Sequence, residues 1–392
     1  MTVPGNAVNT FIPVARPWMD EQEAAAARRA ILSGWVTQGP EVAAFEREFA
    51  DAVGAPHACA VSSCTTALHV ALAALGVGSG DEVITVSHSF IATANAIRYC
   101  GAIPVFVDIE LATLNIDPGL VEPAIGPRTK AILAVHQIGM PCDLRALTAI
   151  AARHGLPLIE DAACAIGSEV EWDGAWQRIG RPHGDIACFS FHPRKLLSTG
   201  DGGMLATRSA ELDRAFRLLR QHGMSVPDAV RHSSNQIIFE EYPVAGYNYR
   251  MTDIQAAIGR EQLKRLPAIV ARRRELAARY EAGLRSVAGL VVPREPRWAR
   301  SNWQSYAVRL GAWIDQRTFM QRMLDAGIAT RRGVMNAHRE RAYPAGTWRA
   351  GSGLSRSEEA QDTTVILPLF HQLTEEDQDR VVDTIARVIR DM

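Results

Sequence analysis

Five apolar runs of strand length recur in the first half of the chain, separated by segments with the period of a helix. Each run is continuous rather than alternating, which is typical of strands covered on both faces of a sheet. Helical patterns occupy Thr65–Leu75, Ala92–Tyr99 and Leu144–His154. This alternation predicts an α/β fold with a mainly parallel sheet between helices. The predicted strands are Glu82–Ser87, Ile103–Ile109, Ala131–His136, Leu156–Asp161 and Asp185–Phe191.

The pattern changes after Gly246. Thr252–Leu284 has the period of one long, arginine-rich amphipathic helix, with Pro267 as a point where it could break. We therefore predict a large α/β domain with an N-terminal arm over residues 1–250. A long linking helix and a smaller α+β domain are predicted over residues 251–392. The later segments are one predicted strand and two predicted helices, at Ser305–Leu310, Gln316–Ala326 and Thr374–Arg390.

Charge and composition exclude several classes of partner. The 392 residues include 42 Lys and Arg and 43 Asp and Glu, a formal net charge of −1, so bulk attraction to nucleic acid or an anionic membrane is not expected. The uncharged stretch Ala52–Gly80 contains too many Gly, Pro, Ser and Thr residues for a transmembrane helix. The start of the chain lacks an export-signal pattern, and the six cysteines lack paired zinc-finger spacing. We therefore expect a cytoplasmic protein without a metal site.

Three polar features are predicted to lie at the carboxyl edge of the sheet, where open α/β sheets bind ligands. Asp161 ends one predicted strand, and Lys195 follows the next. The hydroxyl-rich segment Val61–Thr66 leads into a helix, whose N-terminus can bind a phosphate. An acid, a lysine amine and a phosphate cradle are what pyridoxal 5′-phosphate (PLP) requires of a protein. Each feature also has an ordinary interpretation as a helix cap, a turn or a solvated side chain, so the residues alone leave both open.

Longer segments of the chain resemble the DegT/StrS-type sugar aminotransferases, which are PLP enzymes of fold type I. The resemblance runs from about Pro13 to the C-terminus, and the block FSFHPRKLLSTGDGG is highly specific. It implies a large domain with a mainly parallel, seven-stranded type of sheet between helices. The other segments that carry it are SGWVTQGPEVAAFEREFA, SSCTTALHVAL, GDEVITVSHSFIATANAI, VHQIGMPCDL, IEDAACAIGS and GYNYRMTDIQAAIG.

This resemblance implies roles for five residues of the cofactor site. Lys195 matches the lysine that holds PLP as a Schiff base and then moves the proton. Asp161 matches the acid that contacts the pyridine nitrogen. Ser190 matches the serine that binds the phosphate, and Thr65 with the backbone of Cys64 matches the other phosphate contacts.

The resemblance also implies a shared site. Asn248 matches an asparagine that reaches the phosphate of the neighbouring subunit, so a homodimer is expected, and Phe90 matches an aromatic residue that stacks on the ring. Two positions depart from the family pattern. Cys64 replaces a usual Gly, and Cys164 replaces the Gln or His that usually stacks on the other ring face. Both could be small buried fillers, or Cys164 could leave room for a substrate feature.

The implied reaction is a two-stage transamination. An amino donor, L-glutamate, converts the cofactor to pyridoxamine 5′-phosphate (PMP), and a ketosugar then accepts the amine. Lys195 acts as general acid and base in both stages. The expected acceptor is a nucleotide-linked 4-keto or 3-keto hexose in amino-sugar biosynthesis. A ketocyclitol acceptor, or a PLP-dependent sugar modification other than transamination, remains the alternative.

Four residues are candidates for substrate contacts. His338 matches a family histidine at the substrate end of the cleft. Arg331, with Arg332 beside it, could bind the phosphates of a nucleotide or could belong to a solvated surface patch. His192 and Arg250 adjoin predicted cofactor residues and could also contact substrate.

Overall fold

The computed structural model of the chain describes residues 11–226 and 234–392. Its main feature is an eight-stranded sheet in which β9 is antiparallel to both neighbours and the other paired strands are parallel. This confirms the predicted α/β class, with β14 as one more strand than the seven-stranded type. In spatial order the strands are β1 (His57–Val61), β9 (Gly203–Thr207), β8 (Ile186–Ser190), β5 (Leu158–Asp161), β4 (Thr129–Val135), β2 (Glu82–Val86), β3 (Ile103–Val107) and β14 (Arg349–Ala350).

The central strands are covered on both faces. Every residue of β2, β5, β8 and β9 is buried, which explains why their apolar runs are continuous. Five helices pack against this sheet and contribute to its core. They are α2 (Pro40–Val53), α3 (Cys64–Ala74), α4 (Ala92–Tyr99), α5 (Leu144–His154) and α6 (Ala210–Leu219). Helix α1 (Glu21–Ser33) packs against α8 (Asp253–Leu284) instead, and short 3₁₀ turns lie at Pro118–Leu120, Glu122–Ala124, Gln137–Gly139 and Ala337–Arg339.

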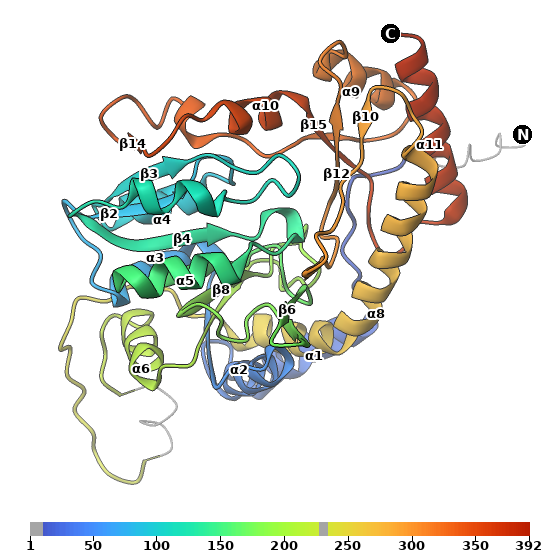
Figure 1. Cartoon of the computed structure of the whole chain (residues 1–392). Coiled ribbons are helices and arrows are strands. Elements are labelled where there is room, and N and C mark those ends of the chain that lie inside the picture. The colour runs from blue at the N-terminus through green and yellow to red at the C-terminus, as the bar shows by residue number, and fades with distance from the viewer. Residues whose placement is uncertain (1–10, 227–233) are drawn as a thin grey trace, which may run out of the picture.

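A single long helix, α8 (Asp253–Leu284), links the two halves of the fold (Figure 1). Thr252 starts it with a capping box, in which its hydroxyl accepts from the N–H of Gln255 at 3.2 Å. The helix continues through Pro267, so the break considered from the sequence is absent. Its first half packs into the core of the large sheet, and its second half packs into a separate core.

That second core surrounds a smaller antiparallel sheet. Its strands, in spatial order, are β10 (Leu290–Val291), β12 (Tyr306–Leu310), β15 (Thr364–Leu367) and β13 (Arg331–Arg332). Helices α9 (Gln316–Asp325) and α11 (Glu375–Arg390) pack here, and α10 (Ser355–Thr363) precedes β15. The exact boundary between the predicted domains stays a prediction.

Two further segments extend from this framework. A hairpin of β6 (Glu169–Trp172) and β7 (Ala175–Arg178) forms a three-stranded sheet with β11 (Ala299–Arg300). Residues 234–246 form an extended segment that projects from the body near α6 (Figure 1). Ile237 and Phe239 on this segment are each 88% exposed.

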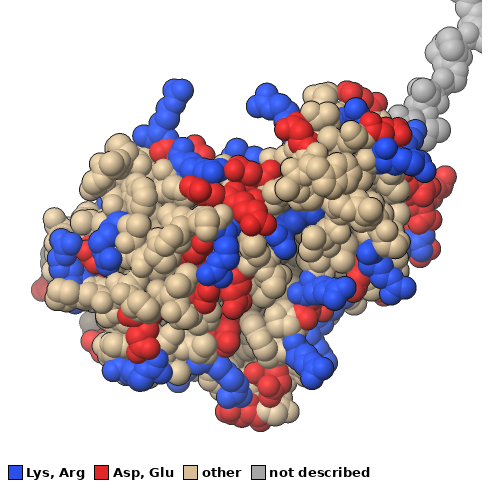
Figure 2. Space-filling model, turned by 45° about the horizontal axis from the view of Figure 1, so that its top comes forward, with Lys and Arg blue, Asp and Glu red and all other residues tan. Residues whose placement is uncertain are grey.

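The surface agrees with the balanced composition. Lys and Arg side chains are interspersed with Asp and Glu over the face shown in Figure 2. Within residues 11–226 and 234–392, no helix has the length and apolar character needed to cross a bilayer.

Candidate active site

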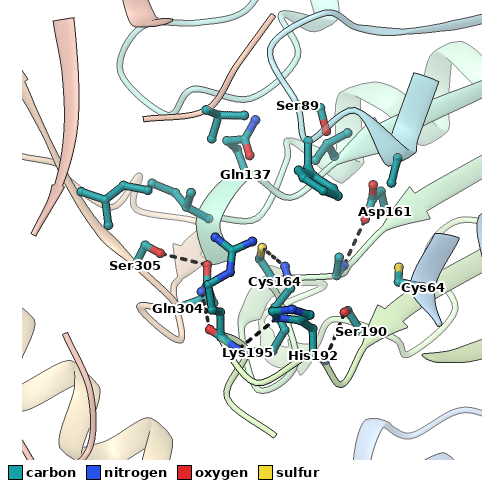
Figure 3. A pocket seen from close by; sticks show the side chains of 18 of the residues that line it. Cys64, Ser89, Gln137, Asp161, Cys164, Ser190, His192, Lys195, Gln304 and Ser305 are labelled. Atoms are coloured by element: carbon teal, nitrogen blue, oxygen red, sulfur yellow. Dashed lines mark hydrogen bonds between the residues drawn. The ribbon is translucent and has the colours of Figure 1, made fainter. Parts of the chain in front are cut away.

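A cavity of about 810 Å³ lies at the carboxyl edge of the large sheet (Figure 3). The ends of β4, β5 and β8 reach it through Val135, Asp161 and Ser190. Residues of β13 and β15, from the smaller sheet, line it as well. The cavity therefore lies where the two sheets meet, which is a usual place for a ligand in such a fold.

Lys195 lies on the turn that follows β8 and lines the cavity. Its backbone N–H donates to the carbonyl of His192 at 2.8 Å, which closes this turn. Its Nζ donates to Sγ of Cys164 at 2.9 Å (Figure 3). The turn thus holds a primary amine beside open volume, as a covalent bond to a cofactor requires.

Asp161 ends β5 and is 5% exposed. Its carboxylate accepts from the hydroxyl of Thr93 at 2.7 Å and from the N–H of Ala163 at 3.1 Å. Burial raises the pKa of Asp161, although these two hydrogen bonds act in the opposite direction. No residue in the described parts of the chain forms a salt bridge with it. A protonated ring nitrogen would supply the missing cation, so this acid fits PLP.

The N-terminus of α3 forms an anion cradle. Ser63 caps the helix by accepting from the N–H of Thr66 at 3.2 Å, which leaves the N–H groups of Cys64 and Thr65 without an intrahelical acceptor. The hydroxyls of Thr65 and Ser190 line the same cavity. Two backbone donors, two hydroxyls and the helix dipole are suited to a phosphate group.

Gly203, at the start of β9, packs directly against this cradle. A Cβ at position 203 would lie 2.4 Å from the backbone carbonyl of Ser63 and 2.7 Å from the backbone nitrogen of Cys64. Only glycine allows β9 to approach the helix so closely. Gly203 therefore shapes the cradle through its close packing, and Asp201 of the same GDGG segment lines the cavity.

The two cysteines that depart from the family pattern have different surroundings. Cys64 is buried, and burial raises the pKa of its thiol well above the ordinary value, so it is a neutral filler behind the cradle. Cys164 lines the cavity and contacts Lys195. Of the two, only Cys164 touches a residue with predicted chemistry.

The cavity brings together most, but not all, of the predicted site residues. Those that line it are Lys195, Asp161, Cys64, Thr65, Phe90, Cys164, Ser190, His192 and Arg331. Asn248, Arg250 and His338 do not line it. His338 is held by Ser87 at 2.7 Å and by Glu358 at 3.1 Å, so both of its ring nitrogens are occupied within the fold.

Several residues that shape the site were not identified from the sequence. Thr93 and Gln137 follow the ends of β2 and β4, and the carboxyl-edge rule applied to Asp161 would also have found them. Gln304 also lines the cavity, and its Nε2 donates to the carbonyl of Arg194 at 2.9 Å. Its position depends on a loop with no periodic pattern.

Asn302 is fully buried and joins the segments around the cavity. Its Nδ2 donates to the carbonyls of Cys164 and Ile166, both at 2.8 Å, and its Oδ1 accepts from the N–H of Gln304 at 2.9 Å. A Cβ at Gly139 would lie 2.1 Å from this Oδ1, and Gly139 has a φ of +99°. Asn302 therefore joins the backbone of Cys164 and Ile166 to that of Gln304, and Gly139 leaves it the space.

Replacing Asn302 with alanine is expected to lower the free energy of unfolding by about 3 kcal/mol, because buried backbone groups lose their partners. Urea unfolding followed by circular dichroism measures this change. Asn235→Ala, at an exposed position, is the matched control and should change stability by less than about 0.5 kcal/mol. Equal stability of the two variants would show that Asn302 does not hold these segments.

A buried acid, a lysine and a phosphate cradle around one cavity of an α/β fold define a PLP-dependent enzyme. Comparison with known proteins then identifies its family. Residues 17–386 match the DegT/DnrJ/EryC1/StrS aminotransferase family, and the chain belongs to it. The protein is therefore a PLP-dependent aminotransferase.

Three relatives illustrate this similarity. The spore coat polysaccharide biosynthesis protein SpsC of Bacillus subtilis is 38% identical over 386 residues, which cover 97% of this chain and 98% of that protein. The aminotransferase TlmJ of Streptoalloteichus hindustanus is 37% identical, with a TM-score of 0.88 over 97% of this chain and 99% of that one. The sugar aminotransferase Spr1654 of Streptococcus pneumoniae, described as putative and solved in its PMP form, is 26% identical, with a TM-score of 0.90 over the same shares of the two chains.

Proposed function

We propose that the protein transfers an amino group from L-glutamate to a ketosugar, specifically a nucleotide-linked 4-keto or 3-keto hexose, in the cytoplasm. The observation that carries this proposal is the single cavity that joins Lys195, Asp161 and the cradle of α3. The cavity has a volume of about 810 Å³ and extends beyond these groups to β13 and β15. This size supports a substrate larger than an amino acid. The relative SpsC is named for polysaccharide biosynthesis, which supports a sugar as the acceptor.

PLP, when bound, supplies a ring that withdraws electrons from the reacting carbon of the substrate. The residues of this chain position the group and move the proton. Ser190, Thr65 and the N-terminus of α3 would hold the phosphate, and the Asp161 carboxylate would face the ring nitrogen. The Nζ of Lys195 would move a proton between the reacting carbon of the substrate and C4′ of the cofactor. Cys164 Sγ, 2.9 Å from that Nζ, would orient the amine.

The acceptor is tested with enzyme whose cofactor has first been converted to the amine form by L-glutamate. Nucleotide 4-ketohexoses, nucleotide 3-ketohexoses and ketocyclitols are then offered in turn, and recovery of the aldehyde form is followed by absorbance. Fastest recovery with a nucleotide ketohexose is expected. Fastest recovery with a ketocyclitol would replace the proposed acceptor, and no conversion by any amino donor would refute the proposal.

We further propose that two subunits form each active site. Asn248 is exposed in the single chain and lies outside the cavity, as expected of a residue that serves a neighbouring subunit. The loop that precedes it exposes Ile237 and Phe239, which supports an apolar contact with a second copy. Such a contact would be symmetric, as in most homodimers.

Mixing two impaired variants tests this arrangement. Lys195→Ala and Asn248→Ala homodimers are each expected to have low activity. If Asn248 acts across the interface, each mixed dimer contains one intact site, so random exchange should restore about a quarter of wild-type activity. Activity is measured after the subunits are separated and reassociated. No restoration would place Asn248 in its own subunit's site or outside any site.

A further inference from the structure

The cavity is locally positive although the chain is almost neutral. Four of its lining residues are Lys or Arg and two are Asp, whereas the formal net charge of the whole chain is −1. Three of the four, Arg194, Arg331 and Arg332, form no salt bridge with any residue in the described ranges. Neither of the lining acids, Asp161 and Asp201, pairs with these arginines, so the arginines are available to a substrate anion.

The arginines come from two separate parts of the fold. Arg194 directly precedes Lys195, and its backbone is held on both sides. Its carbonyl accepts from Gln304 at 2.9 Å, and its N–H donates to Nδ1 of His192 at 3.2 Å. Arg331 and Arg332 form β13, which pairs with β15 of the smaller sheet. Both backbones are therefore fixed before any ligand binds.

These positive charges influence one another. Burial lowers the pKa of Arg331, and Arg194 and Arg332 lower it further. Burial likewise lowers the pKa of His192, with Arg194 as the next cause. Repulsion between like charges disfavours this arrangement, and an anion bound between them would relieve it.

We infer that Arg194 and Arg331 form one anion clamp that serves both substrates in turn, the carboxylate of the amino donor and the phosphate of the acceptor. This inference rests on the proposed function, in which both substrates react beside Lys195. A guanidinium group binds carboxylate and phosphate with the same planar pair of donors, so one clamp can hold either group. Arg194 lies on the turn after β8 of the large sheet and Arg331 lies on β13 of the smaller sheet, so a bound anion would hold the two parts together.

The first test measures the two half-reactions separately in the holoenzyme. Arg194→Gln and Arg331→Gln are each expected to raise the half-saturating concentration of both L-glutamate and a nucleotide ketohexose about tenfold or more. Arg194→Lys keeps the positive charge, so its half-saturating concentrations should rise less than those of Arg194→Gln. Arg317→Gln is the matched control, because Arg317 is exposed on α9 and does not line the cavity. Unchanged half-saturation for both substrates in both variants would overturn the inference.

The second test requires no turnover. Glutarate and inorganic pyrophosphate are titrated into the holoenzyme by calorimetry, since neither can react. Both should bind to wild type and bind about tenfold or more weakly to Arg194→Gln and Arg331→Gln. Weakening of one ligand alone contradicts a shared clamp, and absence of binding to wild type contradicts any clamp. If no half-reaction occurs in wild type, the proposed function fails, while these titrations still decide about the clamp.

Discussion

Lys195→Ala is expected to reduce transamination on the order of 10⁴-fold, because in the proposed function this residue supplies both the covalent bond to the cofactor and the proton transfer. Borohydride reduction followed by mass spectrometry measures the first role directly. Wild type should retain the cofactor covalently at Lys195, and the variant should retain none. The cradle of α3 and Asp161 remain in the variant, so it should still bind PLP reversibly.

Lys264→Ala is the matched control for this experiment. Lys264 is an exposed lysine on α8 that pairs with Glu261 at 2.7 Å, and it does not line the cavity. The Lys264→Ala variant should retain the reduced cofactor at Lys195 and should turn over substrate at the wild-type rate. Near-normal turnover in Lys195→Ala, with the cofactor bound, would exclude the assigned role.

Asp161→Asn is expected to lower turnover and cofactor affinity by about 100-fold, since a neutral amide cannot stabilise positive charge on the ring nitrogen. The same change should stabilise the cofactor-free protein near neutral pH. Burial raises the pKa of Asp161 in the folded state, so the folded chain binds this proton more tightly than the unfolded chain does. Wild-type apoprotein stability therefore falls as pH rises from the unfolded pKa through the folded one.

Thermal unfolding of the two apoproteins between pH 4 and pH 8 measures this effect. The variant should be relatively more stable at pH 7 than at pH 4. In kinetic assays and PLP titrations of the same proteins the order should be reversed, with higher turnover and tighter PLP binding in wild type than in Asp161→Asn. A variant that binds PLP as tightly as wild type, or gains no relative stability with rising pH, contradicts the role of a buried, unneutralised acid.

The sequence predicted the central elements because their burial leaves a direct signature. The run ending at Asp161 is continuous and apolar since β5 is covered on both faces. Lys195 and Asp161 could be placed at one edge because parallel strands end together. Strands β1, β9 and β15 were not predicted, and neither were the short strands β6, β7 and β14, because segments of two to five residues carry little usable period.

The rest of the site depends on contacts far apart in the chain. Asn302 donates a hydrogen bond to the carbonyl of Cys164, 138 positions earlier, and no local sequence pattern predicts such a pair. Trp303, next to it, has a φ of +51°, a conformation that its residue type does not favour. Arg194 likewise has significance only once β13 is seen to line the same cavity. The sequence predicts Lys195 and Asp161 as the reacting groups, whereas the residues that support them are evident only in the tertiary structure.

The continuity of α8 has a consequence for how the protein unfolds. Leu266 and Ile269 belong to the core of the large sheet, and Leu276 and Tyr280 belong to the core of the smaller one. If either core unfolded, the part of α8 that packs into it would lose its apolar contacts. The rest of the helix would then begin at a frayed end and be less stable. The chain should therefore melt as one cooperative unit, with a calorimetric enthalpy close to the van't Hoff value, although it contains two cores.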